Sequence, residues 1–239
     1  MNQDALDGFV DKWRSRWPEW GIAEAFVPQA QRVPVAAWFA LLQELHEAAW
    51  AGVEAAPGLA KLAWWQEELG GWSRGARRHP LGQVLQRMEA GWEALGLALA
   101  ALPATRDPGA GDTGQDALRS YATAVLTCEA RLFGGDTPEP AALEAFVDGL
   151  RIERALSRGE LDAALALRPA LEARAGALFG RPRRLRQAVL RERLRALAAG
   201  RPPAGGAGLR VSPLRLLWSA WRAARPGNAS LHGQRPTGR

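Results

Sequence analysis

The chain has 239 residues, of which 47% are hydrophobic and 23% are charged, and this composition is typical of a globular protein with a real core. A single cysteine, Cys128, excludes an internal disulfide and a cysteine-rich zinc site, and the three histidines are too scattered to indicate a metal cluster. The net charge of +6 is divided unevenly, because residues 1–180 carry −7 and residues 181–239 carry +13. Such a basic C-terminal part indicates an anionic partner, either a membrane surface or a nucleic acid.

The first residues are acidic and lack the basic region and apolar run of a signal peptide. The longest apolar run, Leu95 to Leu102, is far shorter than the roughly 20 residues that span a bilayer. We therefore expect a cytoplasmic protein that is able to associate peripherally with the inner membrane.

Apolar residues recur at helical spacing along most of the chain. The first clear stripe is Trp38, Leu41, Leu42, Leu45 and Ala49. Pro57 and Gly58 interrupt it, and a second helix is predicted from Leu59 to Trp72.

The remaining helices are predicted from turn formers and apolar spacing. They cover 81–102, 115–133, 136–157 with Asp136 or Thr137 as N-cap, 160–179 and 183–199, with a loop at 103–114. A Pro- and Gly-rich linker at 200–213, an amphipathic helix at 214–225 and a disordered tail at 226–239 follow. We expect an all-α protein of seven to nine helices, with one domain over 1–199.

The chain lacks the common catalytic motifs, such as HExxH, GxSxG, CxxC and a phosphate-binding glycine loop. Its most informative stretch is KLAWWQEEL at 61–69, which contains Lys61, Trp64 and Trp65 and is followed by His79 and Pro80. This stretch resembles the squalene/phytoene synthase family, in which a K/R-L-x-W-W-R-x-E-L helix precedes an H-P pair. Weaker similarity covers 120–134 and 212–225.

The resemblance implies a single helical bundle of the isoprenoid synthase type. Active members of that family join two prenyl diphosphates head to head. They carry two D-x-x-x-D motifs on facing helices, whose carboxylates hold the magnesium ions that neutralise the diphosphate leaving group. An apolar cavity shelters the carbocation.

The first acidic motif of the family corresponds to Gln43, Glu44 and Glu47 in this chain. An amide therefore replaces the leading carboxylate, although Glu44 and Glu47 are able to share one metal ion. The alternative interpretation is that these three residues form the solvated face of an amphipathic helix.

The second acidic motif falls on Ile152 and Leu156, which are unable to bind metal. Glu144 and Asp148 have the required i, i+4 spacing but lie one turn too early. The resemblance therefore implies a catalytically degenerate protein without cofactor, which binds an isoprenoid or lipid or acts as an assembly factor, a role with precedent among mitochondrial relatives. The alternative is an active magnesium-dependent prenyltransferase in which Glu44 and Glu47 face Glu144 and Asp148.

The C-terminal helix places Trp218 and Trp221 beside Arg215 and Arg222, a pattern typical of contact with an anionic membrane. The helix at 183–199 similarly surrounds its apolar residues with arginines. A solvated arginine-rich helix packed on the domain is the alternative, and a third hypothesis for the whole chain is an arginine-rich membrane adaptor. We expect no nucleic-acid partner, because no nucleic-acid-binding motif is present.

Five further residues receive separate interpretations. Trp64 and Trp65 are predicted to pack in the core, and His79 to shape the turn before Pro80. His46 lacks a third ligand at a suitable spacing, and Cys128 is predicted to be a buried, unreactive thiol.

Overall fold

The structure is a computed structural model that describes residues 3–107, 111–135, 139–175, 180–200, 203–204, 208–209 and 211–225. Its longer helices are α1 (Gln3–Arg16), α3 (Arg32–Trp50), α4 (Ala56–Ser73), α7 (Gly111–Phe133), α8 (Pro140–Ser157), α11 (Arg181–Ala198) and α12 (Pro213–Ala224). The shorter ones are α2 (Trp20–Ala23), α5 (Gly82–Leu85), α6 (Trp92–Ala98), α9 (Leu161–Ala166) and α10 (Arg168–Ala173). Three 3-10 segments (Glu24–Phe26, Gln29–Gln31 and Leu99–Thr105) and a short antiparallel pair, Pro203–Ala204 with Gly208–Leu209, complete the described elements.

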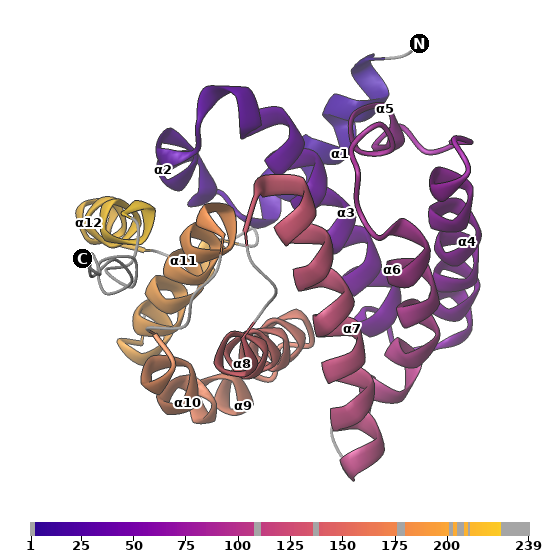
Figure 1. Cartoon of the computed structure of the whole chain (residues 1–239). Helices are drawn as coiled ribbons and strands as arrows, with labels where there is room; N and C mark the ends of the chain where they lie inside the picture. Colours follow the sequence, from indigo (N-terminus) through magenta and orange to yellow (C-terminus); the bar gives the residue numbers. More distant parts are fainter. Residues whose placement is uncertain are drawn as a thin grey trace, which may run out of the picture.

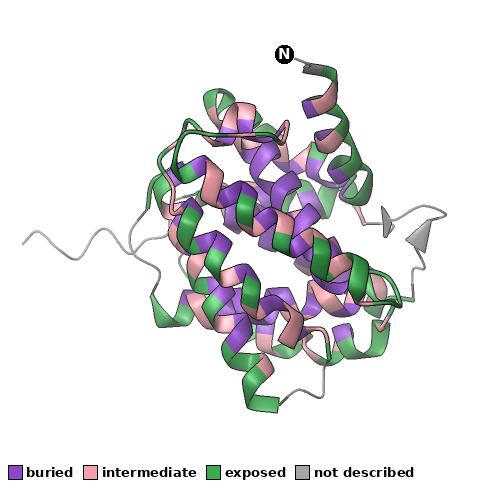
Figure 2. Cartoon of the chain, turned by 90° about the vertical axis from the view of Figure 1, so that its right-hand side faces the viewer, coloured by how far each residue is buried: buried purple, intermediate pink, exposed green. Residues whose placement is uncertain are grey.

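The all-α prediction is confirmed. Figure 1 shows α11 and α12 on one side of the molecule and α4 and α6 on the opposite side, with α3, α7 and α8 between them. Buried residues line the inner faces of these helices, whereas exposed residues follow the outer faces (Figure 2). The described helices therefore pack around one shared core.

The central helix α3 is buried nearly all round. It contacts α1, α4, α5 and α8, and its predicted stripe from Trp38 to Ala49 is fully buried. The interpretation of Gln43, Glu44 and Glu47 as a solvated face is wrong for Glu44, which is buried, and Gln43 and Glu47 are half-buried. Helix α1 covers the polar side, and its apolar residues Leu6, Val10 and Trp13, with Trp17 directly after the helix, have helical spacing.

Two predicted helices are divided. The segment 81–102 forms α5, an irregular stretch, α6 and a 3-10 segment, and Gly91, with φ −81° and ψ 56°, ends the irregular stretch as the N-cap of α6. The segment 160–179 forms α9 and α10, which separate at Leu167, because Pro169 in the first turn of α10 has no N–H group to continue the hydrogen-bond pattern of α9. Residues 176–179 lie outside the described part.

The other predicted helices are confirmed with small changes at their ends. Helix α7 begins at Gly111, α8 begins at Pro140, and α11 and α12 each begin at or before a proline in the first helical turn. The predicted N-cap at Asp136 or Thr137 and the tail at 226–239 lie outside the described residues. Among the described helices, none combines the length and apolar composition needed to cross a bilayer.

Helices α3 and α4 approach closely at Gly58. A Cβ atom at this position would lie 2.2 Å from the carbonyl oxygen of Ala48, which is impossible without moving the backbone. Gly8 in α1 provides a contrast, because a Cβ atom there would meet no atom within 4 Å.

We predict that Gly58→Ala lowers the free energy of unfolding by about 2 kcal/mol or more, because the two helices must move apart. Gly8→Ala serves as the control and should raise it by about 0.5 kcal/mol through helix propensity alone. Urea denaturation followed by far-UV circular dichroism measures both changes. Equal effects of the two substitutions would contradict the close approach.

Candidate functional site

The residues of the first predicted acidic motif lie where α1, α3 and α4 meet. Both carboxylate oxygens of Glu44 are occupied, because Lys12 donates to one at 2.5 Å and Lys61 donates to the other at 2.6 Å. Glu47 accepts from Lys12 at 2.6 Å and from the Gln43 amide at 3.2 Å. Ammonium groups thus stand where a bound cation would be expected.

The charge state of Glu44 follows from these contacts. Burial by itself would raise the pKa of this carboxyl group, but the hydrogen bonds from Lys12 and Lys61 outweigh burial and lower the pKa below its ordinary value. Glu44 is only 4% exposed, whereas the Lys12 and Lys61 side chains are 42% and 39% exposed, so a buried, ionised carboxylate is covered by two lysines that reach the surface.

The second candidate pair, Glu144 and Asp148, lies on α8 and also has basic partners. Arg119 of α7 donates to Glu144 at 2.8 Å, and Arg174, which follows α10, donates to Asp148 at 2.6 Å. Ile152 is fully buried, as expected for an apolar side chain. Within the described residues there is no group of three or more histidine, cysteine, aspartate or glutamate side chains that could hold a metal ion.

The segment that resembles the synthase family forms α4 and the turn that follows it. Glu68 is buried and accepts hydrogen bonds from the Trp72 indole and from the backbone N–H groups of Arg78 and His79, each at 2.7–2.8 Å. These bonds attach the end of α4 to the turn before Pro80. Trp65 is buried beside Trp72, whereas Trp64 is partly buried and contacts the Arg78 guanidinium.

His79 has the structural role that the sequence predicts. Its ring packs against Phe9 and Trp65, with centroids 4.3 and 4.5 Å apart, and its Nδ1 atom accepts from the Leu81 N–H. Burial lowers the pKa of His79 to about 4, so the ring is neutral at pH 7. Cys128 is buried as predicted, and burial raises the pKa of its thiol to about 12.

The interior between α3, α7, α8 and α11 contains ion pairs that the sequence interpretation missed. Arg183 of α11 forms two hydrogen bonds with Glu129 of α7, and the Trp38 indole donates to the same carboxylate at 2.7 Å. The Arg183 guanidinium also lies 4.2 Å from the centroid of the Phe146 ring. All four side chains are buried.

A second pair joins α11 to α8. Arg186 donates to Glu153 at 3.0 Å, and the Nδ1 atom of His46 lies 3.6 Å from the same carboxylate. The Nε2 atom of His46 is 3.1 Å from the Tyr121 hydroxyl. Burial would raise the pKa of Glu153, but the charge of Arg186 and the hydrogen bond from His46 hold the pKa far below its usual value. Burial also lowers the pKa of His46.

A third pair joins α11 to the segment before α2. Arg193 donates to Glu19 at 2.5 Å, and the guanidinium groups of Arg186 and Arg193 lie 3.5 and 3.8 Å from the centroid of the Trp17 ring. The prediction that Arg186 and Arg193 surround the apolar face of their helix is therefore wrong. They project into the core with Leu185 and Val189.

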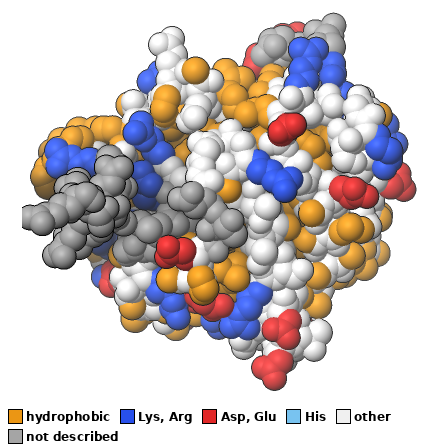
Figure 3. Space-filling model, viewed as in Figure 1, with side chains coloured by type: hydrophobic (Ala, Val, Ile, Leu, Met, Phe, Trp, Pro, Cys, Tyr) orange, Lys and Arg blue, Asp and Glu red, His pale blue; other side chains and the backbone are white. Residues whose placement is uncertain are grey.

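Helix α12 packs one side on α11 and exposes the other. Leu216 and Ala220 are buried, and Ser219 donates to Glu192 of α11 at 2.6 Å. On the outer side Leu214 is 79% exposed and Trp218 is 58% exposed. Figure 3 shows hydrophobic and basic atoms side by side at the left edge of the molecule, where Figure 1 places α12.

The four predicted membrane-contact residues share α12. Trp218 and Trp221 stack with their ring centroids 4.8 Å apart, and Arg222 is exposed beside them. Arg215 is also exposed and lies 3.9 Å from Glu192, too far for a strong ion pair. The structure thus brings these four side chains onto one outward-facing helix.

We predict that Arg186→Met lowers the free energy of unfolding by about 3 to 5 kcal/mol, because it leaves the Glu153 carboxylate buried without its guanidinium partner. Adding Glu153→Gln should recover a large part of this loss. A double-mutant cycle measured by chemical denaturation gives the coupling between the two residues. Additive losses in the double variant would contradict a buried, mutually dependent pair.

Comparisons of the chain with protein-family models, with curated proteins and with solved structures found no match. The resemblance to the squalene/phytoene synthases therefore remains a prediction from the sequence.

Proposed function

We propose that this chain is a non-catalytic protein, similar to the squalene/phytoene synthases, that binds anionic membrane surfaces through α12 and acts there as a lipid-binding or assembly factor. The observation that carries the proposal is the outer face of α12. It presents Leu214, Leu217 and Trp218 to solvent beside Arg215 and Arg222.

The physical basis is the chemistry of the bilayer interface. Exposed leucine and tryptophan side chains gain free energy when they enter the boundary between headgroups and acyl chains. The exposed arginines beside them, Arg215 and Arg222, are attracted to anionic lipid. The opposite side of α12 is fixed to α11 by Leu216 and Ala220, so the exposed face is held outward.

Three observations support the non-catalytic part of the proposal. The oxygens of Glu44 are occupied by lysines, and Ile152 stands where the resemblance requires an acid. The interior between α3, α7, α8 and α11 holds the Arg183–Glu129 and Arg186–Glu153 pairs, which are charged and packed. An interior that holds charged pairs is unsuited to shelter a prenyl carbocation. We therefore propose that lipid is contacted at the surface of the protein.

The alternative of an active prenyltransferase requires Glu44 and Glu47 to converge with Glu144 and Asp148 on a shared metal site. Each of these acids instead has an arginine or lysine partner. No observation favours this alternative over the membrane-binding function.

We predict that the full chain sediments with phosphatidylcholine vesicles that contain one-fifth phosphatidylserine, and much less with pure phosphatidylcholine vesicles. The double variant Leu214→Ser/Trp218→Ser should bind at least about tenfold more weakly, because two large side chains no longer enter the interface.

Leu97→Ser is the matched control, because Leu97 is 63% exposed but lies on α6, on the opposite side of the molecule. This variant should bind like the unmodified chain. Equal binding by the double variant and the control, or equal binding to neutral and anionic vesicles, would overturn the proposed function.

A further inference from the structure

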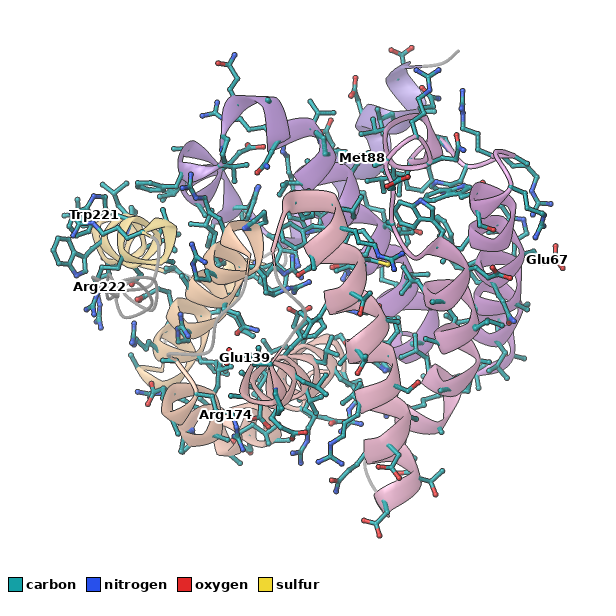
Figure 4. All side chains as sticks on the ribbon, in the orientation of Figure 1. Glu67, Met88, Glu139, Arg174, Trp221 and Arg222 are labelled. Atoms are coloured by element: carbon teal, nitrogen blue, oxygen red, sulfur yellow. The ribbon has the colours of Figure 1, made fainter. Side chains whose placement is uncertain are left out.

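A groove of about 920 Å³ lies beside the exposed face of α12, between α10, α11 and α12. Eight arginines and two glutamates line it, so its walls are strongly positive. Two of these arginines are labelled in Figure 4: Arg174 follows α10, and Arg222 lies on α12. Helices α10 and α12 flank α11 at the groove. The exposed side chains of Leu214 and Trp218 also line the groove, which makes part of its wall apolar.

The two glutamates of the groove already have partners. Glu192 accepts hydrogen bonds from Arg195 and Ser219, and Glu172 accepts one from Arg168. Arg191 and Arg222, by contrast, form no salt bridge or side-chain hydrogen bond within the described part of the chain. An excess of positive charge therefore remains for an external anion.

Arg191 is stronger evidence for an anion site than Arg222. Burial lowers the pKa of its guanidinium and the neighbouring charge of Arg195 lowers it further, and these two effects outweigh the opposite effect of Glu192 and Glu172. A bound anion would relieve both effects, since it supplies charge-assisted hydrogen bonds in a partly desolvated place.

A buried amide in the same groove provides an independent observation. Gln187 is only 4% exposed and its Oε1 atom has no hydrogen-bond partner within the described structure. Its side chain lies against Gly149 of α8, where a Cβ atom would come within 2.8 Å of Nε2. Gln187, Arg191 and Arg195 are spaced i, i+4 and i+8, so they share one face of α11.

The free oxygen of Gln187 needs a donor, whereas the arginines need an acceptor. We propose that the groove binds a phosphate ester that carries free hydroxyl groups, with the phosphate at Arg191 and Arg222 and a hydroxyl donating to Gln187. Glycerol phosphate has this chemistry, either as a phospholipid headgroup or free in solution. The lipid-bound form rests on the membrane contact proposed for α12, whereas the soluble form does not.

The first arm of the test uses the full chain and soluble probes, measured by isothermal titration calorimetry. We expect saturable binding of glycerol 3-phosphate that Arg191→Gln and Arg222→Gln each weaken about tenfold, the loss of one charge-assisted contact. Gln187→Met should reduce the affinity for glycerol 3-phosphate to that for inorganic phosphate, because only the hydroxyl contact is removed.

Arg87→Gln is the matched control, because it removes the same charge from an exposed site that follows α5, away from the groove. It should leave binding unchanged. Thermal unfolding of each variant verifies folding, and Arg222→Gln keeps the test valid if a buried variant fails to fold, because Arg222 is exposed on α12.

The second arm compares phosphatidylcholine vesicles that contain equal amounts of phosphatidylglycerol or phosphatidylserine. These lipids carry the same net charge, but only phosphatidylglycerol offers headgroup hydroxyls. We expect the full chain to prefer phosphatidylglycerol and the Gln187→Met and Arg191→Gln variants to lose the preference. A preference for phosphatidylglycerol vesicles without binding of soluble glycerol 3-phosphate still supports the groove proposal, with a phospholipid headgroup as the ligand.

Equal binding to both vesicles together with no saturable soluble binding would overturn the groove proposal and leave the membrane contact of α12 standing. Binding of soluble glycerol 3-phosphate without any vesicle binding would support the groove and overturn the proposed function. Loss of soluble binding in Arg87→Gln as large as in Arg191→Gln would show general charge attraction and would also overturn the groove proposal.

Discussion

Three guanidinium groups of α11 are buried in the centre of the molecule, and each needs a carboxylate from another segment. Glu129 of α7, Glu153 of α8 and Glu19 before α2 supply them. A buried charge without a partner costs several kcal/mol, so α11 can pack in only one position relative to these segments. The position of α11 in turn places α12, which is fixed to it by Leu216 and Ser219.

These ion pairs bear on both parts of the proposed function, the absence of catalysis and the binding of a membrane surface. A prenyl diphosphate synthase needs an apolar cavity lined by free carboxylates. In this chain the central carboxylates are neutralised by arginines, and aromatic rings such as Trp17 and Phe146 pack on the guanidinium groups. Helix α11, which supplies these buried guanidinium groups, also carries Arg191 and Arg195, which line the groove beside α12.

Apolar spacing was sufficient to predict α7, α11 and α12, because each has one clear buried stripe or proline start. It also predicted the stripe on α3, but not that α1 covers the polar side of that helix, although Leu6, Val10, Trp13 and Trp17 have the spacing that could have indicated it. Arg183, Arg186 and Arg193 were missed because arginine is normally a surface residue unless it is paired. Their partners lie 54, 33 and 174 residues away, a distance that no local pattern reveals.

The most direct test of a filled, non-catalytic interior is a turnover measurement on the purified full chain with a prenyl diphosphate and magnesium. The release of pyrophosphate is followed with time. Because Glu44 is held by two lysines and the central carboxylates by arginines, we expect no release above the rate without protein. Magnesium-dependent release that stops in Glu44→Gln would contradict the account, since it would require Glu44 to leave its lysines and bind metal.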